Sequence, residues 1–233
     1  MKQSNLKLIA PIYLLLGAAG AGLYRAIYAF SLDARELVIR GGIYEMALWV
    51  LTAVVLLSAV VISSKTRVEA IGNPPILGCL IYALGIFTLT LENAKGPVPL
   101  VMLYRIMTWA AIASLLASVV LRIFRKPHHF LLDVAPCILC ILHLVECYQL
   151  WSEVPQLTDY VFGLGAILCI VLFAYHNMAF RARLPGKRIY AFAGLAGIFF
   201  CCVAAAGTVF ELYFLSTAVW MASMFFVPRA AEA

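Results

Sequence analysis

The sequence predicts an all-α protein: a single domain over residues 1–233, built as a polytopic bundle of transmembrane helices. Hydrophobic residues make up 65% of the chain and charged residues only 12%, whereas a soluble domain carries about 25% charged residues. The mean hydropathy is +1.00. A globule of 233 residues cannot bury that much apolar surface and stay in solution. The composition excludes a soluble enzyme, a disordered protein and a disulfide-stapled secreted domain, and it predicts the lipid bilayer as a partner.

Six apolar runs are long enough to cross a bilayer, which takes about 20 residues. They cover residues 8–30, 42–63, 75–91, 98–121, 131–151 and 158–180. A further apolar stretch, residues 189–227, has 39 residues, and as one helix it would extend about 58 Å, nearly twice the hydrocarbon thickness. It must turn back, and residues 205–208 form the natural corner. The sequence therefore predicts eight spans, the last two over residues 189–205 and 210–227.

The basic residues predict the orientation of these spans. Of the 17 Lys and Arg residues, twelve fall at the termini and in the loops on one side, three on the other side, and two within spans. Because cytoplasmic loops carry an excess of Lys and Arg, both termini are expected in the cytoplasm of a plasma-membrane protein. The twelve are Lys2, Lys7, Lys65, Arg67, Arg122, Arg125, Lys126, Arg181, Arg183, Lys187, Arg188 and Arg229, and the three are Arg35, Arg40 and Lys95.

The net charge of +6 does not predict a nucleic-acid partner. Binding nucleic acid needs Lys and Arg gathered on one folded face. Here the basic residues lie in short, separate loops between apolar runs, as the positive-inside rule describes.

Four ionisable side chains fall at one predicted depth within the spans. Arg25, Arg105, Glu45 and Glu146 each lie roughly 5–10 Å beneath the outer boundary, at about 1.5 Å per residue. Charged residues inside a span are costly and by default suggest a functional site. One interpretation is that the two arginines pair with the two glutamates and fix the helix packing. The other is an outward-facing pocket in which the guanidinium groups bind a small polar or anionic solute.

Several tyrosines at a similar depth are candidates to line such a pocket. Tyrosines also gather at membrane interfaces for reasons unconnected with a ligand, so both interpretations apply to them. They are Tyr24, Tyr28, Tyr44, Tyr104 and Tyr148, of which Tyr24 and Tyr104 each directly precede an arginine of the charged layer.

The fifth span carries a polar stripe. Cys140, His143 and Cys147 follow one another at i, i+3 and i+7, and Glu146 is three residues after His143. This spacing offers two or three ligands to a metal such as Zn²⁺, but a closed tetrahedral site needs one more from another span. His176 is too far along the sixth span to supply it. The sequence therefore predicts polar contacts here, and it predicts neither a metal nor a cofactor.

Cys137 and Cys140 form a Cys-x-x-Cys motif, which resembles that of the quinone-linked disulfide-oxidising membrane proteins. That family keeps the pair at the outer membrane face and uses a second pair in an outer loop. Here Cys137 falls in the inner half of its span, and none of the seven cysteines lies in a loop. A buried thiol is unreactive, so no redox function is predicted.

Two loops on the cytoplasmic side are rich in basic residues. His128 and His129, beside Arg125 and Lys126, are expected to form a solvated loop. The cluster over residues 181–188 is expected to anchor the topology and to contact anionic lipid headgroups, at about 1 kcal/mol per charge.

Short motifs beside the spans carry a resemblance to a known family. The motifs are Leu23-Tyr24-Arg25 with Phe30 to Asp33, Tyr148 to Trp151 with Pro155 and Asp159-Tyr160, and Phe173-Ala174-Tyr175 with the 181–188 loop. With the hydropathy layout, they resemble an uncharacterised family of eight-span integral membrane proteins of Gram-positive anaerobes. The resemblance implies a plasma-membrane location and an all-helical bundle, and it implies no activity.

Three functional hypotheses follow from the charged residues. The first is transport or sensing of a small polar or anionic solute, with Arg25 and Arg105 holding the anion, Glu45 and Glu146 balancing it, and His143 tuning the site with pH. The second is a non-catalytic structural or regulatory membrane subunit whose charged layer only fixes the packing. The third is a membrane-embedded lipid-modifying enzyme with His143 and Glu146 as acid and base. No nucleophile or metal set is complete, so an enzyme is not favoured.

Overall fold

A computed structural model of the chain describes residues 4–30, 41–66, 73–91, 98–152, 160–182, 187–207 and 210–226. These residues form eight α-helices and one short 3₁₀ helix, with no strand among them. The predicted all-α class is confirmed. The loops over residues 31–40 and 153–159, which contain Arg35, Arg40 and parts of the family motifs, lie outside the described residues, as does Lys95.

The helices follow the apolar runs of the sequence. They are α1 Ser4–Phe30, α2 Ile43–Lys65, α3 Ile76–Leu91, α4 Val98–Ile123, α5 Val134–Ser152, α6 Val161–Arg181, α7 Lys187–Ala205 and α8 Glu211–Met224, with the 3₁₀ helix η1 at Phe130–Asp133. The chain turns at Ala206 and Gly207, within the corner that the sequence analysis placed at residues 205–208. The long apolar stretch therefore forms two helices, α7 and α8.

Six of the helices are long and apolar enough to cross a membrane. They are α1, α2, α4, α5, α6 and α7. The other two are shorter: α3 has 16 residues and α8 has 14, so they extend about 24 Å and 21 Å, less than the hydrocarbon thickness of about 30 Å. The architecture is that of a multi-pass membrane protein with six candidate spans among the described residues.

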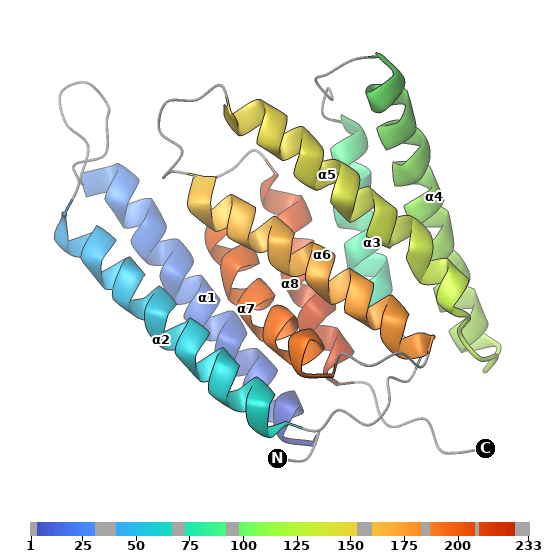
Figure 1. Cartoon of the computed structure of the whole chain (residues 1–233), viewed down its shortest axis with the longest axis horizontal. Helices are drawn as coiled ribbons and strands as arrows, with labels where there is room; N and C mark the ends of the chain where they lie inside the picture. Colours follow the sequence, from blue (N-terminus) through green and yellow to red (C-terminus); the bar gives the residue numbers. More distant parts are fainter. Residues whose placement is uncertain are drawn as a thin grey trace.

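The helices lie side by side in one bundle, with α1 and α2 at one side, α4 at the other, and α7 and α8 between them (Figure 1). α7 packs against α1, α2, α6 and α8 and is the most central. Within its apolar window 78% of the residues are buried, compared with 28% for α1, α2 and α4. The outer helices instead expose large apolar side chains such as Leu8, Ile43 and Leu57, which is the surface that lipid tails would cover.

Glycines permit two close helix crossings that hold this arrangement. A Cβ atom at Gly17 of α1 would lie 2.7 Å from the Cβ of Cys202 on α7. A Cβ atom at Gly85 of α3 would lie 1.6 Å from the Oγ of Ser216 on α8. Small residues at helix contacts let two backbones approach closely, which favours association inside a membrane.

Candidate functional site

The side chain of His143 is fully buried near the middle of the bundle. It is the tenth of the 19 residues of α5, which extends from Val134 to Ser152. Cys137, Cys140, His143 and Cys147 are all buried, and their spacing of three or four residues puts them on one face of the helix. That face points into the bundle, which explains why the polar stripe predicted from the sequence is enclosed by protein.

Two side chains compete for one ring nitrogen of His143. The hydroxyl of Tyr104 on α4 lies 3.1 Å from Nδ1, and the Oε2 of Glu146 lies 3.4 Å from the same atom. When Nδ1 carries a proton, it donates to the Glu146 carboxylate; when it does not, the Tyr104 hydroxyl donates to Nδ1. The position of one proton therefore decides whether the imidazole is bonded to its own helix or to α4.

Aromatic rings and a thiol enclose the rest of the imidazole. Phe210 and Tyr213 of α8 meet the ring edge-on, each with a centroid separation of 4.9 Å. The Sγ of Cys147 lies 3.6 Å from Nε2. These neighbours exclude water from the ring, and polar interactions strengthen in such a low-dielectric setting. We call Tyr104, His143, Glu146 and Cys147 the His143 network.

The predicted charged layer is not one cluster. Arg25 forms an ion pair with Glu211 at the start of α8, with Nη2 3.1 Å from Oε1, and the two side chains are 65% and 50% exposed. The predicted pairing of Arg25 with Glu45 or Glu146 is therefore wrong. Glu45 instead accepts a hydrogen bond of 2.7 Å from the backbone N–H of Gly41, at the start of its own helix. Arg105 is exposed on α4.

Tyr24 contacts aromatic residues of α1 and α6. Its hydroxyl is 3.2 Å from that of Tyr28, and its ring meets Phe162 of α6 edge-on. Of the residues proposed from the sequence, the structure joins Tyr104, His143 and Glu146. Arg25 and Glu45 have the other partners described above.

Among the described residues, no group of three or more His, Cys, Asp or Glu side chains is arranged to hold a metal ion. The Sγ of Cys140 lies 3.5 Å from the hydroxyl of Tyr82 on α3. All seven cysteines are buried and free, so Cys137 and Cys140 form no disulfide.

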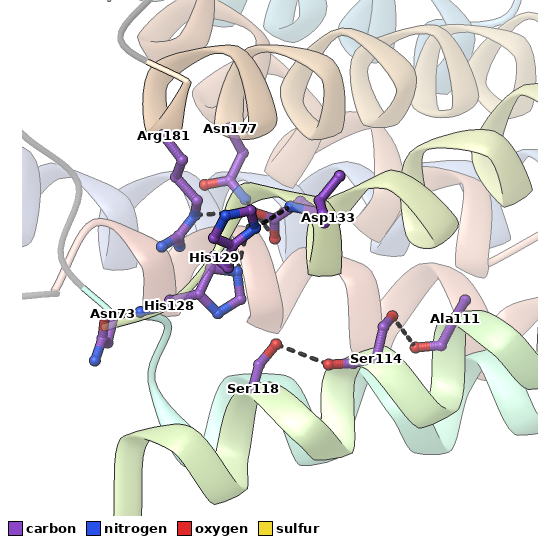
Figure 2. Close-up of polar contacts among 10 residues, drawn as sticks. Asn73, Ala111, Ser114, Ser118, His128, His129, Asp133, Asn177 and Arg181 are labelled. Atoms are coloured by element: carbon purple, nitrogen blue, oxygen red, sulfur yellow. Dashed lines mark hydrogen bonds and ion pairs between the residues drawn. The ribbon is translucent and has the colours of Figure 1, made fainter. Parts of the chain in front are cut away.

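A second polar cluster, not predicted from the sequence, lies at the N-terminal end of α5. The side chain of His128 is only 1% exposed, and its Nε2 lies 3.1 Å from the Oδ2 of Asp133 (Figure 2). The prediction of a solvated loop is wrong for His128, although His129 is exposed. The sequence did contain a signal for this cluster, because Asp133 lies at the start of an apolar run and five residues after His128.

Comparison of the chain with known protein families, with curated proteins and with solved structures finds no match. The resemblance to an eight-span family remains a prediction, and function has to be inferred from the geometry of the chain.

Proposed function

We propose that the protein is an eight-span plasma-membrane transporter that moves a small polar or anionic solute in step with proton transfer at His143. The observation that carries this proposal is the fully buried imidazole near the middle of α5, contacted at one nitrogen by both Tyr104 and Glu146. Chains of Asp, Glu and His inside membrane domains act as proton relays in pumps and transporters. Coupling sites of secondary transporters commonly lie near the midplane of the bilayer.

Eight spans are supported by the surroundings of the two short helices. Most of α8 is buried, and it packs against α3 and α7, which cover it on two sides. Helix ends at membrane depth are tolerated where protein surrounds them. Successive helices run in alternating directions in Figure 1, as spans of a multi-pass protein must.

The proposed orientation is supported by the charge of the two ends. Of the ten Lys and Arg residues among those described, eight lie at the end of the bundle where α2, α4 and α6 finish. Under the positive-inside rule this end faces the cytoplasm. The eight are Lys7, Lys65, Arg122, Arg125, Lys126, Arg181, Lys187 and Arg188.

The first turn of α8 connects the outer surface with the buried imidazole. Phe210 contacts the ring of His143, while the adjacent Glu211 pairs with Arg25 on the exposed side. A solute that competes for the Arg25 guanidinium would release Glu211 and allow this turn to move against His143. Differential contacts of this kind are what a ligand needs in order to shift a conformational equilibrium.

Proton flux in proteoliposomes tests the proposal. Vesicles containing the full chain and a trapped pH-sensitive dye would be exposed to a panel of small carboxylates, amino acids and inorganic anions. We expect at least one solute to change the internal pH, and we expect His143→Gln and Glu146→Gln to lower that rate about tenfold or more. His129→Gln is the matched control, because the same substitution at an exposed histidine should leave the rate unchanged. Equal rates in all three variants would contradict the proposal.

A structural or regulatory subunit is the second candidate. The observation that favours it is the ion pair between Arg25 and Glu211, which connects α1 to α8 and needs no ligand. If no solute in the panel changes the internal pH, and Arg25→Gln lowers the unfolding temperature of the protein, a structural or regulatory subunit is the better account.

A further inference from the structure

The second polar cluster lies where α4 and α6 end and α5 begins. Its centre is the carboxylate of Asp133, the last residue of η1. Oδ2 contacts His128 Nε2 at 3.1 Å and Arg181 Nε at 2.9 Å, and Oδ1 accepts a bond of 3.4 Å from Asn177 Nδ2 (Figure 2). We call Asp133, His128, Asn177 and Arg181 the Asp133 cluster. It joins the loop before α5 to the last two turns of α6.

These side chains are enclosed, yet several of their polar atoms have no partner. The side chains of His128 and Arg181 are 1% and 6% exposed. Among the described residues, nothing hydrogen-bonds to the Nη2 of Arg181, the Nδ1 of His128 or the Oδ1 of Asn177. The Nε of Arg181 is close to Asp133 but is not aligned for a hydrogen bond, so that contact is an ion pair.

Unpaired buried atoms of this kind are rare in folded proteins, and each calls for an explanation. A guanidinium nitrogen is the costliest of them to leave without an acceptor. The neighbouring polar groups of α4 do not reach it, because the hydroxyls of Ser114 and Ser118 donate to backbone carbonyls of their own helix (Figure 2). The unpaired atoms therefore call for a bound group that offers acceptors to Arg181 and a donor to Asn177.

The charge around the cluster favours an anion over a cation. Arg122 on α4 donates to the backbone carbonyls of Asn73 and Pro74 beside α3, and Arg125 and Lys126 follow in the loop. One carboxylate, Asp133, does not offset these groups.

A further buried hydroxyl lies on α7, which begins at this end of the bundle. The hydroxyl of Tyr190 is buried and makes no hydrogen bond to the described residues.

We propose that the Asp133 cluster binds one phosphate group, either as inorganic phosphate or as the monoester headgroup of a phospholipid in the adjacent leaflet. The Nη2 of Arg181 supplies a charge-assisted hydrogen bond to a phosphate oxygen, and guanidinium is well suited to this anion. Because Nε2–H of His128 faces the Asp133 carboxylate, the Nδ1 of the neutral ring is an acceptor and can take a hydrogen bond from a P–OH group. Asn177 Oδ1 can only accept, so it selects a phosphate that keeps a P–OH group, which a diester headgroup lacks.

This proposal does not depend on solute transport and is tested separately. Thermal unfolding of the purified full chain would be followed in inorganic phosphate and in sodium chloride of equal ionic strength. The same protein would be followed in phosphatidylcholine micelles alone, with added phosphatidic acid, and with added phosphatidylglycerol. Three variants would be compared with the wild type: Arg181→Gln combined with Asp133→Asn, Arg181→Lys, and the control Arg188→Gln.

We expect phosphate or phosphatidic acid to raise the unfolding temperature of the wild type and of Arg188→Gln. The double variant removes both charges of the ion pair, so no unpaired charge remains in the site. Because it lacks the guanidinium, it should bind phosphate or phosphatidic acid at least tenfold more weakly than the wild type. Arg181→Lys retains the ion pair with Asp133 but lacks the second nitrogen of the fork, so it should also bind about tenfold more weakly even if the double variant fails to fold.

The two sources of the phosphate give different results. Stabilisation by inorganic phosphate identifies a free-anion site, whereas stabilisation by phosphatidic acid and not by phosphatidylglycerol identifies a lipid headgroup. If neither raises the unfolding temperature above the sodium chloride control, or if Arg188→Gln loses the effect as fully as the Arg181 variants, the proposal is overturned.

Discussion

The middle and the start of α5 carry buried polar groups of different kinds. Near the middle of the helix, His143 has one nitrogen contacted by two side chains, so its bonding pattern changes with a single proton. At the start of the helix, Asp133 has contacts to three donors, while atoms on the donor side chains remain without partners. The first arrangement suits a group that exchanges protons, and the second suits a fixed ion pair beside a bound ligand.

The two clusters are separate in the structure and can be tested independently. Asp133 and His143 are ten residues apart, a separation of about 15 Å along the helix. Each is enclosed by a different set of helices, since α6 supplies Arg181 to one and α8 supplies Phe210 to the other. The following substitutions test whether the two clusters differ as described.

The largest effect is expected at Asp133. Replacing Asp133 with Ala leaves the Arg181 charge enclosed without its counter-ion, so the free energy of unfolding should fall by about 3–5 kcal/mol. Thermal unfolding of the purified protein would measure it. Adding Arg181→Met should recover much of the loss, because the unpaired charge is then removed. A loss of less than about 1 kcal/mol would mean that the ion pair is solvated.

A smaller loss of stability is expected when His143 is replaced. His143→Ala removes a fully enclosed ring, opens a cavity against Phe210 and Tyr213, and leaves Tyr104 and Glu146 without their shared partner. The free energy of unfolding should fall by about 2–4 kcal/mol. His129→Ala is the control, because that ring is exposed and makes one cap hydrogen bond, from the Leu131 N–H, so stability should change by about 1 kcal/mol or less. Equal losses in the two variants would contradict the enclosed position of His143.

The Tyr104 hydroxyl should contribute less to the free energy of unfolding than the His143 ring does. Tyr104→Phe keeps the ring and removes one hydrogen bond to His143, so we expect a loss of about 1 kcal/mol, together with slower proton flux in proteoliposomes. Tyr148→Phe removes the hydroxyl of an exposed tyrosine near the end of α5 and should have no effect on flux. An unchanged flux in Tyr104→Phe would show that α4 takes no part in proton transfer.

The smallest effect on stability is expected at the exposed ion pair. Glu211→Gln breaks the contact with Arg25, and exposed pairs contribute about 0–1 kcal/mol. The unfolding temperature should therefore hardly change. A loss as large as that of Asp133→Ala would mean that the Arg25–Glu211 pair is as enclosed as the Asp133 cluster, and the comparison between the two regions would fail.

Hydropathy predicted the helices because span length and turning points are one-dimensional properties of a chain. The corner after α7 followed from simple length, and the i, i+3 pair of His143 and Glu146 followed from helix periodicity. The position of a residue along its helix was equally accessible, and it placed Arg25 near the end of α1 and Tyr104 near the start of α4.

Which helices are neighbours could not be predicted from the sequence in the same way. The position of a residue along its own helix does not identify the helix beside it. Arg25 pairs with Glu211, 186 residues later in the chain, because α1 lies against α7 and α8. His128 was missed for another reason. Its loop looked polar enough to be solvated, but the ion pair between Asp133 and Arg181 draws the histidine inward.

The central claim is that His143 exchanges a proton while enclosed by the bundle. Nitrogen NMR of ¹⁵N-histidine-labelled protein in lipid bilayers tests it most directly, with His143→Gln used to assign the signal. We predict two forms of the imidazole, one with Nδ1 protonated and bonded to Glu146 and one with Nδ1 unprotonated and bonded to Tyr104, whose proportions change when a transported solute is added. A single form with and without the solute would contradict the claim.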